Sequence, residues 1–268
     1  MKKIILAGLI SLSTMSYAQP SRGAWGLYDY DVAEYQQVYN RSEIRSIASI
    51  TKLFTATTIV RSGLSLDEAV KVQGSSKGRF AKGSLVKRID LMKAMLISSD
   101  NLAAETLALT YPGGMNGFLY DTHTWVRGWG LVDTTIVDAS GLMSGNQSTV
   151  DDLVVFMQRI KNIEVIQSIS REEQATLLVP KGRKEIKLHL VNTNPVIVKY
   201  DNILLSKTGT TNAAGRCVVM LVERNGNIHG IVILGQKNQQ ERTKISEMLI
   251  NLIPFNRAVA GESEKIGH

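Results

Sequence analysis

Three short motifs in the sequence combine hydroxyl, amine and amide side chains in a way that suits nucleophilic catalysis. They are Ser49-Ile50-Thr51-Lys52, Ser99-Asp100-Asn101 and Lys207-Thr208-Gly209. A serine hydroxyl is a weak nucleophile until a base removes its proton. None of the four histidines lies in a motif, so the sequence gives no support for a Ser-His-Asp triad and points to a lysine as the base.

The first motif predicts a serine and a lysine on one face of a helix. Ser49 lies at the start of a predicted helix over residues 50–61, and Lys52 follows it by three positions, which is about one helical turn. Lys52 can act as the base if burial and a second cation at Lys207 lower its pKa until some neutral amine is present near pH 7. Taken alone, the motif is more typical of a serine that only caps a helix.

The other two motifs also have structural explanations when each is taken alone. Ser99-Asp100-Asn101 interrupts a helical stretch, where such residues form turns. Lys207-Thr208-Gly209 ends an apolar strand, where a lysine protects a sheet edge and a glycine marks close approach by another backbone or a ligand. Together and in this order the three motifs are specific, because they form a signature of class A β-lactamases and penicillin-binding proteins.

Longer stretches around the motifs resemble the low-molecular-mass D-alanyl-D-alanine peptidases. The matching stretches are residues 46–53, 96–105, 140–142 and 206–217. The last one is similar to the D-alanyl-D-alanine endopeptidase branch, the penicillin-binding protein seven type. The likeness covers residues 24–254. Related carboxypeptidases have a further C-terminal β domain and a membrane-binding helix, whereas this chain stops soon after its last predicted helix, which favours the endopeptidase branch.

The resemblance implies catalytic roles for four residues. Ser49 would be the acylated nucleophile and Lys52 its base. Ser99 would pass a proton to the leaving amine. Asn101 would orient both the substrate peptide and Lys52.

The resemblance also implies a substrate-binding strand around the third motif. Lys207 and Thr208 would hold the carboxylate end of the substrate, with Gly209 beside them. The backbone amides of Ser49 and Thr210 would form an oxyanion hole, in which one donor is worth about 3–4 kcal/mol. No cofactor and no metal is expected.

The implied function is a serine D,D-peptidase that cleaves D-alanyl crosslinks in peptidoglycan and is inhibited by β-lactams, with a D-alanyl-D-alanine carboxypeptidase as the alternative. A β-lactamase is less well supported, because class A enzymes need Glu-x-x-Leu-Asn after the second motif and the comparable region, residues 138–142, reads Asp-Ala-Ser-Gly-Leu. A non-catalytic penicillin sensor is also less well supported, because known sensors are joined to a membrane segment. Expected partners are peptidoglycan peptides and β-lactam antibiotics, with no nucleic acid; partner proteins among the wall enzymes stay open.

The N-terminus has the pattern of a signal peptide over residues 1–18. Lys2 and Lys3 precede a short apolar core over residues 4–10, and Ser16-Tyr17-Ala18 offers the small residues that a signal peptidase reads. Cleavage after Ala18 predicts a periplasmic protein. No later apolar run reaches the ~18 residues of a membrane span, so no transmembrane anchor is expected.

Charge and cysteine content exclude few functions. The formal net charge of +7 falls to +5 without residues 1–18, because two of the 31 basic residues and none of the 24 acids are removed. A basic chain suits an acidic partner, and the basic loop over residues 73–87 is explained either by solvation or by contact with an anionic wall polymer. The single cysteine, Cys217, excludes an intrachain disulfide and lies in an apolar run that predicts an inert buried thiol. Arg216 could bind a substrate carboxylate or form a surface ion pair.

The elements needed to position the motifs predict an α+β fold. Apolar periodicity predicts strands over residues 24–30, 34–39, 196–200, 203–207, 216–223 and 228–234. It predicts helices over residues 50–61, 91–97 (capped by Asp90) and 102–109, after a cap at Ser148, and near the C-terminus around residues 245–252. The expected architecture is β-lactamase/DD-peptidase-like: a five-stranded antiparallel sheet flanked by helices, with an inserted all-helical subdomain.

The predicted organisation has four parts. Residues 1–18 are the signal peptide, 19–56 and 194–254 form the sheet subdomain, 57–193 form the helical subdomain, and 255–268 are a flexible tail.

Overall fold

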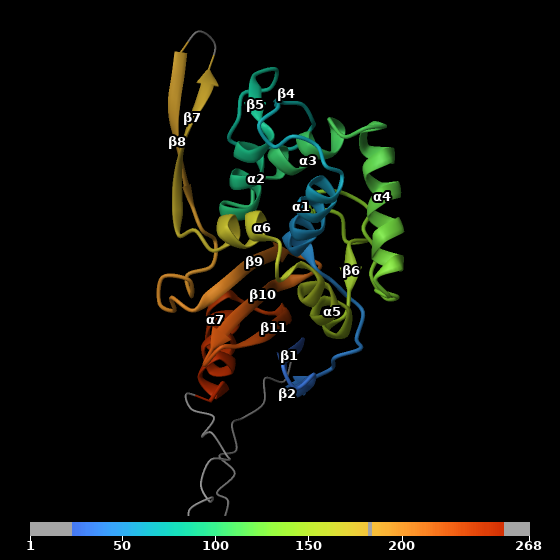
Figure 1. Ribbon diagram of the computed structural model, residues 1–268, viewed down its shortest axis with the longest axis vertical. Helices are drawn as coiled ribbons and strands as arrows, with labels where there is room; N and C mark the ends of the chain where they lie inside the picture. The colour runs from blue at the N-terminus through green and yellow to red at the C-terminus, as the bar shows by residue number, and fades with distance from the viewer. Residues whose placement is uncertain (1–22, 182–183, 255–268) are drawn as a thin grey trace, which may run out of the picture.

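Five strands form one antiparallel sheet that joins the two ends of the chain (Figure 1). The computed structural model describes residues 23–181 and 184–254, so the predicted signal peptide and tail lie outside the described residues. The strand order is β2-β1-β11-β10-β9, and β1 pairs with β11. The strands are β1 (Ala24–Asp29), β2 (Glu34–Tyr39), β9 (Ile203–Thr211), β10 (Gly215–Arg224) and β11 (Asn227–Gln236). Strand β9 is therefore an edge strand.

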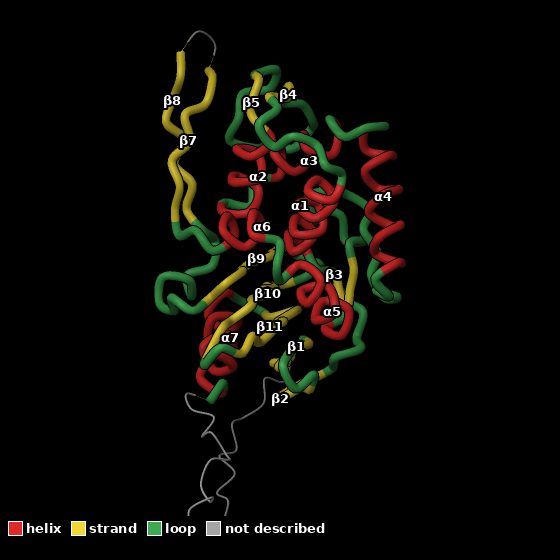
Figure 2. The backbone as a smooth tube through the Cα atoms, viewed as in Figure 1, coloured by secondary structure: helices red, strands yellow, loops and turns green. Residues whose placement is uncertain are grey.

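Helices cover both faces of this sheet (Figure 2). Alternate residues of β10 point to opposite faces, as the pleat requires: Val218 and Met220 pack with α7, whereas Val219 and Leu221 belong to the larger core on the other face. That larger core contains the apolar residues of α1, α2, α3 and α5. The helices are α1 (Thr51–Arg61), α2 (Arg88–Ile97), α3 (Asn101–Leu109), α4 (Gly114–Gly128), α5 (Val150–Ile160), α6 (Glu164–Ser170) and α7 (Gln239–Leu252), and a 3-10 turn, η1 (Ala48–Ile50), precedes α1.

The α+β fold class with a five-stranded antiparallel sheet is confirmed, and the insert between the sheet halves is corrected in one respect. It is mainly helical, but it also contains two hairpins, β4–β5 and β7–β8. Within β7, Leu177 and Val179 are buried while Leu178 is exposed, which is strand alternation. This short pattern forms a strand because its apolar face packs on α2, a contact that the sequence does not show. The small strands are β3 (Arg45–Ser46), β4 (Ala69–Lys71), β5 (Leu85–Lys87), β6 (Gln147–Ser148), β7 (Gln174–Lys181) and β8 (Lys184–Val191).

The strand predicted over residues 196–200 is wrong, because local hydrogen bonds coil this segment into turns. The side chain of Asn194 accepts from the amide of Val196, and its carbonyl accepts from Ile197. The amide of Tyr200 bonds back to Val196. A side chain that satisfies nearby backbone groups competes with strand pairing.

Two predicted helix caps are also wrong, each by a few residues. Asp90 lies inside the first turn of α2, which begins at Arg88. Thr149, rather than Ser148, caps α5 by accepting from the amide of Asp152. The hydroxyl of Ser148 instead bonds to Thr134.

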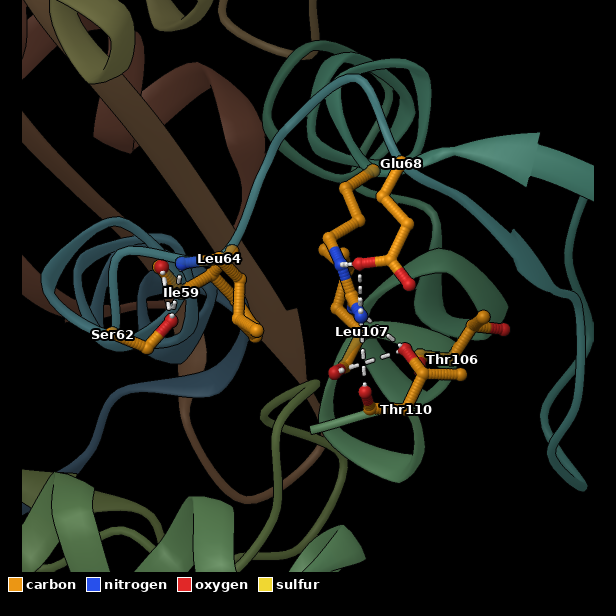
Figure 3. Close-up of polar contacts among 8 residues, drawn as sticks. Ile59, Ser62, Leu64, Glu68, Thr106, Leu107 and Thr110 are labelled. Carbon is orange, nitrogen blue, oxygen red and sulfur yellow. Dashed lines mark hydrogen bonds and ion pairs between the residues drawn. The ribbon is translucent and has the colours of Figure 1, made fainter. Parts of the chain in front are cut away.

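A buried guanidinium joins the start of α2 to the end of α3 (Figure 3). Arg88 is 3% exposed and donates to the hydroxyl of Thr110 at 2.9 Å and to its carbonyl at 3.1 Å. Its Nη2 also lies 3.3 Å from Glu68 Oε2. In the same view, Ser62 closes the C-terminal end of α1 by donating to the carbonyl of Ile59. These contacts fix the ends of three helices that surround the motifs.

Aromatic stacking holds α1 in place. The ring of Phe54 stacks on Phe156 of α5 with centroids 4.0 Å apart and on Trp125 of α4 at 5.8 Å. Phe54 and Phe156 are fully buried. Helix α1, which contains Lys52, is therefore packed between two helices from distant parts of the sequence.

Replacing Phe54 by alanine should destabilise the fold strongly. We expect Phe54→Ala to lower the free energy of unfolding by about 3–5 kcal/mol, because it removes a stacked ring and leaves a cavity. Tyr120→Ala, at a ring that is 73% exposed on α4, is the matched control and should change it by less than about 0.5 kcal/mol. Urea unfolding of both variants tests this, and equal effects would contradict the packing described.

Candidate active site

The amine of Lys52 is the centre of a hydrogen-bond network that includes Ser49. Lys52 is fully buried, and its Nζ lies 3.0 Å from Ser49 Oγ, 2.7 Å from Asn101 Oδ1 and 2.5 Å from the carbonyl oxygen of Ser140. A neutral amine has two N–H donors and one lone pair. The oxygens of Asn101 and Ser140 can only accept, so they take both donors. The lone pair then faces the hydroxyl of Ser49.

Burial makes that neutral amine available near pH 7. It lowers the pKa of Lys52 to about 7, and the carboxylates of Asp138 and Asp100 oppose this shift. Burial also lowers the pKa of Lys207 well below its usual value, and repulsion from Lys52 and Arg242 adds to the effect. The predicted repulsion between the two lysines lowers the pKa of Lys207, whereas burial is the cause that lowers the pKa of Lys52.

Ser49 lies in η1, directly before α1, and does not cap the helix. The cap positions of η1 and α1 are Ile47 and Ile50, and neither makes a side-chain cap bond. The explanation of Ser49 as a mere helix cap is therefore wrong. The preceding residue, Ala48, has φ of 48°, in the left-handed region that is unfavourable for residues with a Cβ. The strained turn sets the direction of the Ser49 side chain.

Two glycines let other backbone segments come close to this turn. A Cβ on Gly209 would lie 2.7 Å from the carbonyl oxygen of Ile47 and 3.0 Å from the amide nitrogen of Ser49. A Cβ on Gly141, whose φ is 82°, would lie 1.9 Å from the carbonyl oxygen of Ala48. The close approach predicted at Gly209 is confirmed, and the approaching backbone is the turn that contains Ser49.

The second motif is a strained break between two helices. Ser99 has φ of 59°, which ends α2, and Asp100 then caps α3 by accepting from the amide of Ala103 at 2.8 Å. The hydroxyl of Ser99 accepts from Lys207 Nζ at 3.0 Å. Asn101 follows on the first turn of α3 and reaches Lys52. The prediction that Ser99-Asp100-Asn101 forms a turn is confirmed. The same turn directs Ser99 to Lys207 and Asn101 to Lys52.

The third motif lies on the edge strand β9. Lys207 is 1% exposed and also donates to the carbonyl of Thr208 at 3.0 Å. The hydroxyl of Thr208 lies 2.6 Å from that of Thr193. Thr210 follows Gly209 on β9, opposite Arg216 on β10, and its side chain is exposed.

Asp138 is a positioning residue that the sequence analysis did not identify. Its carboxylate accepts from the amides of Ser140 and Gly141, both at 2.6 Å, and from that of Met143 at 2.8 Å. It also accepts from the buried side chain of Asn146 at 2.8 Å. Burial alone would raise the pKa of Asp138, but the bonds from these three amides lower it. The carboxylate thereby holds the loop that presents the carbonyl of Ser140 to Lys52.

Arg242 is a second residue that the sequence analysis did not identify. It lies in the first turn of α7, is 4% exposed, and burial lowers its pKa to about 10. Within residues 23–181 and 184–254, no ion pair joins its guanidinium to a carboxylate. Its charge acts on both Lys207 and Arg216. No sequence pattern marks it, because an arginine in the first turn of an amphipathic helix is usually solvated.

All eight predicted site residues thus gather around one turn of the chain. They are Ser49, Lys52, Ser99, Asn101, Lys207, Thr208, Gly209 and Thr210. Cys217 is buried nearby, and burial raises the pKa of its thiol to about 11, which fits the predicted inert thiol. The described part of the chain contains no group of histidine, cysteine, aspartate and glutamate placed to hold a metal, and no helix in it is long and apolar enough to cross a membrane.

Known proteins match this fold and most of the chain. A family model described as D-alanyl-D-alanine carboxypeptidase matches residues 14–238. A D-alanyl-D-alanine endopeptidase of Escherichia coli is 32% identical over 239 residues, which cover 85% of this chain and 76% of that protein. Another from Pseudomonas aeruginosa is 36% identical over 70% of this chain and 63% of its own length. The crystal structure of the Streptomyces K15 DD-transpeptidase superposes with a TM-score of 0.79, with 20% identity, over 88% of this chain and 98% of that one.

Fold, motif geometry and family match define a serine peptidase of the penicillin-binding type. The chain belongs to the D-alanyl-D-alanine carboxypeptidase family. The resemblance seen in the motifs is confirmed by the endopeptidase relatives at 32% and 36% identity.

Replacing Gly141 by alanine should destabilise the fold, because backbone atoms pack closely against this glycine. We expect Gly141→Ala to lower the free energy of unfolding by more than about 1 kcal/mol, because alanine combines an unfavourable φ with a clash against Ala48. Gly128→Ala at the end of α4 is the control. Its φ is not positive and no atom lies within 4 Å of the added Cβ, so it should raise stability by up to about 1 kcal/mol. Urea unfolding should give opposite signs, and loss of stability in both variants would speak against the described approach.

Proposed function

We propose that the protein is a periplasmic serine D,D-peptidase that cleaves D-alanyl crosslinks of peptidoglycan through an acyl-enzyme on Ser49. The observation that carries the proposal is the buried amine of Lys52, whose Nζ lies 3.0 Å from Ser49 Oγ and whose pKa burial lowers to about 7. A base whose pKa is near the working pH is well suited to proton transfer. The endopeptidase relatives support the crosslink as the substrate.

Acylation begins when Lys52 takes the proton of Ser49 and Oγ attacks the D-alanyl carbonyl carbon. The amide of Ser49, next to β9, and the amide of Thr210 supply the oxyanion hole in this proposal, since a preorganised donor pair stabilises the developing charge. The intermediate collapses by breaking the C–N bond. Ser99 gives its proton to the leaving amine and takes one from Lys207, to which it is hydrogen-bonded. Lys207 then regains a proton from the protonated Lys52, which restores both lysines. The net result is one proton moved from Ser49 to the leaving amine and one ester formed.

The carboxylate of the leaving stem peptide would bind the basic side chains on and next to β9, namely Lys207, Arg216 and Arg242. Arg242 interacts electrostatically with both Lys207 and Arg216, and in the described residues no ion pair joins any of the three to a carboxylate. A substrate carboxylate would supply the missing negative charge and would raise the pKa of Lys207. Arg242 therefore extends the predicted substrate-binding set of Lys207 and Thr208.

Water completes the cycle on the natural substrate, but hydrolysis of a penicilloyl ester should be slow. The Asp138 carboxylate, the acid in the loop beside Lys52, accepts hydrogen bonds from three backbone amides and from Asn146. It is therefore occupied in holding the loop instead of activating water. β-Lactams would then act as inhibitors.

A D-alanyl-D-alanine carboxypeptidase is the second candidate, favoured by the description of the family model. A terminal D-alanine presents a similar carboxylate to the same cations. The proposed function also includes three predictions from the sequence. They are export directed by residues 1–18, subdomain boundaries at 56/57 and 193/194, and a flexible tail over residues 255–268.

The pH dependence of acylation tests the role of Lys52. Only the neutral amine accepts a proton, and with a pKa of about 7 it is about one-tenth neutral at pH 6 and nine-tenths neutral at pH 8. We expect the second-order rate of acylation by a fluorescent penicillin to rise about tenfold between these pH values. Lys52→Arg, which stays charged, should lower the rate at pH 8 by at least ~100-fold. A rate that rises only above pH 9, as for an ordinary lysine, would exclude this base.

Substrate choice is tested by giving the protein without residues 1–18 crosslinked muropeptide dimers and uncrosslinked pentapeptides side by side. Mass spectrometry should show dimers converted to monomers, and Ser49→Ala should be inactive and form no penicilloyl adduct. Loss of terminal D-alanine with intact dimers would identify a carboxypeptidase instead. Fast turnover of penicillin would identify a β-lactamase.

A further inference from the structure

The loop between β4 and β5 is held in one position beside the second motif. The amides of Ser75 and Ser76 donate to the carboxylate of Glu105 at 2.9 and 2.7 Å. The amide of Arg79 donates to Asp100 at 2.7 Å. The ring of Phe80 is buried in the larger core and anchors the loop there. The basic loop predicted over residues 73–87 thus consists of a loop over 73–84 followed by β5, and the name basic loop below means residues 73–84.

Glycines in the basic loop allow this close seating. A Cβ on Gly74 would lie 2.5 Å from the carboxylate of Glu105, and one on Gly78 would lie 2.6 Å from that of Asp100. Asp100 is the residue between Ser99 and Asn101, so the loop is fixed against the same helix break that reaches Lys52 and Lys207. Solvation alone does not account for a loop that is built onto α3 in this way.

The basic side chains of this loop are exposed, because the carboxylates that hold the loop bind its backbone. Between residues 69 and 87 there are five cations and no acid, namely Lys71, Lys77, Arg79, Lys82 and Lys87. Only Lys87 of these forms an ion pair in the described chain, with Asp67. Lys77 and Lys82 are exposed.

The hairpin β7–β8 extends this surface. Arg79 donates to the carbonyl of His189 on β8 at 3.3 Å, which links the basic loop to the hairpin. Lys184 and Lys187 of β8 are exposed, next to one acid, Glu185. Figure 1 shows β4, β5, β7 and β8 together at one end of the molecule, away from α7.

We propose that the basic loop and the β7–β8 hairpin form a binding surface for peptidoglycan as a polymer, through the carboxylates of stem peptides that neighbour the one being cleaved. The inference rests on the proposed function for the identity of the polymer. Charge complementarity favours this occupant, because stem peptides carry free carboxylates at regular intervals. The surface adjoins Ser99 and Asn101, so a polymer bound there keeps further crosslinks near Ser49 and raises their effective concentration.

The test compares two charge-matched variants in a Ser49→Ala background, which prevents cleavage during the binding measurement. Lys77→Gln/Lys82→Gln removes two charges from the basic loop. Lys237→Gln/Lys244→Gln removes two exposed charges beside and on α7 and is the control. Cosedimentation uses purified sacculi from which phosphate polymers have been stripped by acid. We expect the loop variant to bind at least threefold more weakly than the control, and the difference to shrink in high salt.

Equal binding by the two variants would overturn the proposal. Binding only to unstripped sacculi would also overturn it, because the occupant would then be a phosphate polymer. With Ser49 restored, the loop variant should lose more turnover on sacculi than on soluble dimers, while the control keeps the wild-type ratio. Failure of the wild type to cleave dimers would refute the proposed function. The binding measurement in the Ser49→Ala background does not depend on cleavage, so it would still test the binding surface.

Discussion

Desolvation of the Lys52 amine is the constraint on which the rest of the site depends. A fully buried ammonium is unfavourable, so burial lowers the pKa of Lys52 to about 7 and a large share of the amine is neutral at that pH. A buried neutral amine still requires partners for its two N–H groups. Asn101 and the carbonyl of Ser140 meet that requirement, and only then is the lone pair directed to Ser49. Ser49 is therefore activated because both N–H groups of the neutral Lys52 amine have hydrogen-bond partners.

Two carboxylates hold the groups that bind Lys52 and also moderate its pKa. Asp138 fixes the loop that presents Ser140, and Asp100 caps the helix on which Asn101 lies. Both oppose the effect of burial on Lys52. Without them the amine would be a weaker base, so the same charges that shape the backbone keep the pKa in a useful range.

Two of the five non-glycine residues with positive φ in the described chain lie where this network needs them. Ala48 and Ser99 both have left-handed φ values, and each sets the direction of a serine hydroxyl toward a lysine. Gly141 and Gly209 allow a loop and an edge strand to meet the turn before α1. Such strain is retained where the surrounding structure determines it fully. Asp100 further connects the site to the basic loop, so the proposed polymer surface and the reacting groups share one rigid helix start.

The fold class, the three motifs, the five strands of the main sheet and five of the seven helices in the described residues could be predicted from the sequence, because apolar periodicity and turn residues act locally. An example is Asn225-Gly226 between β10 and β11: this residue pair is typical of a two-residue hairpin turn, and both residues have the positive φ that the turn requires. Local patterns failed at residues 196–200 and at β7–β8, where side-chain bonds and packing against α2 decide between turn and strand. The pKa of Lys52, the position of the loop held by Asp138 and the burial of Arg242 depend on the tertiary structure and could not be predicted from the sequence. Burial, and the meeting of carboxylates, carbonyls and cations from distant segments, exist only once the chain is folded.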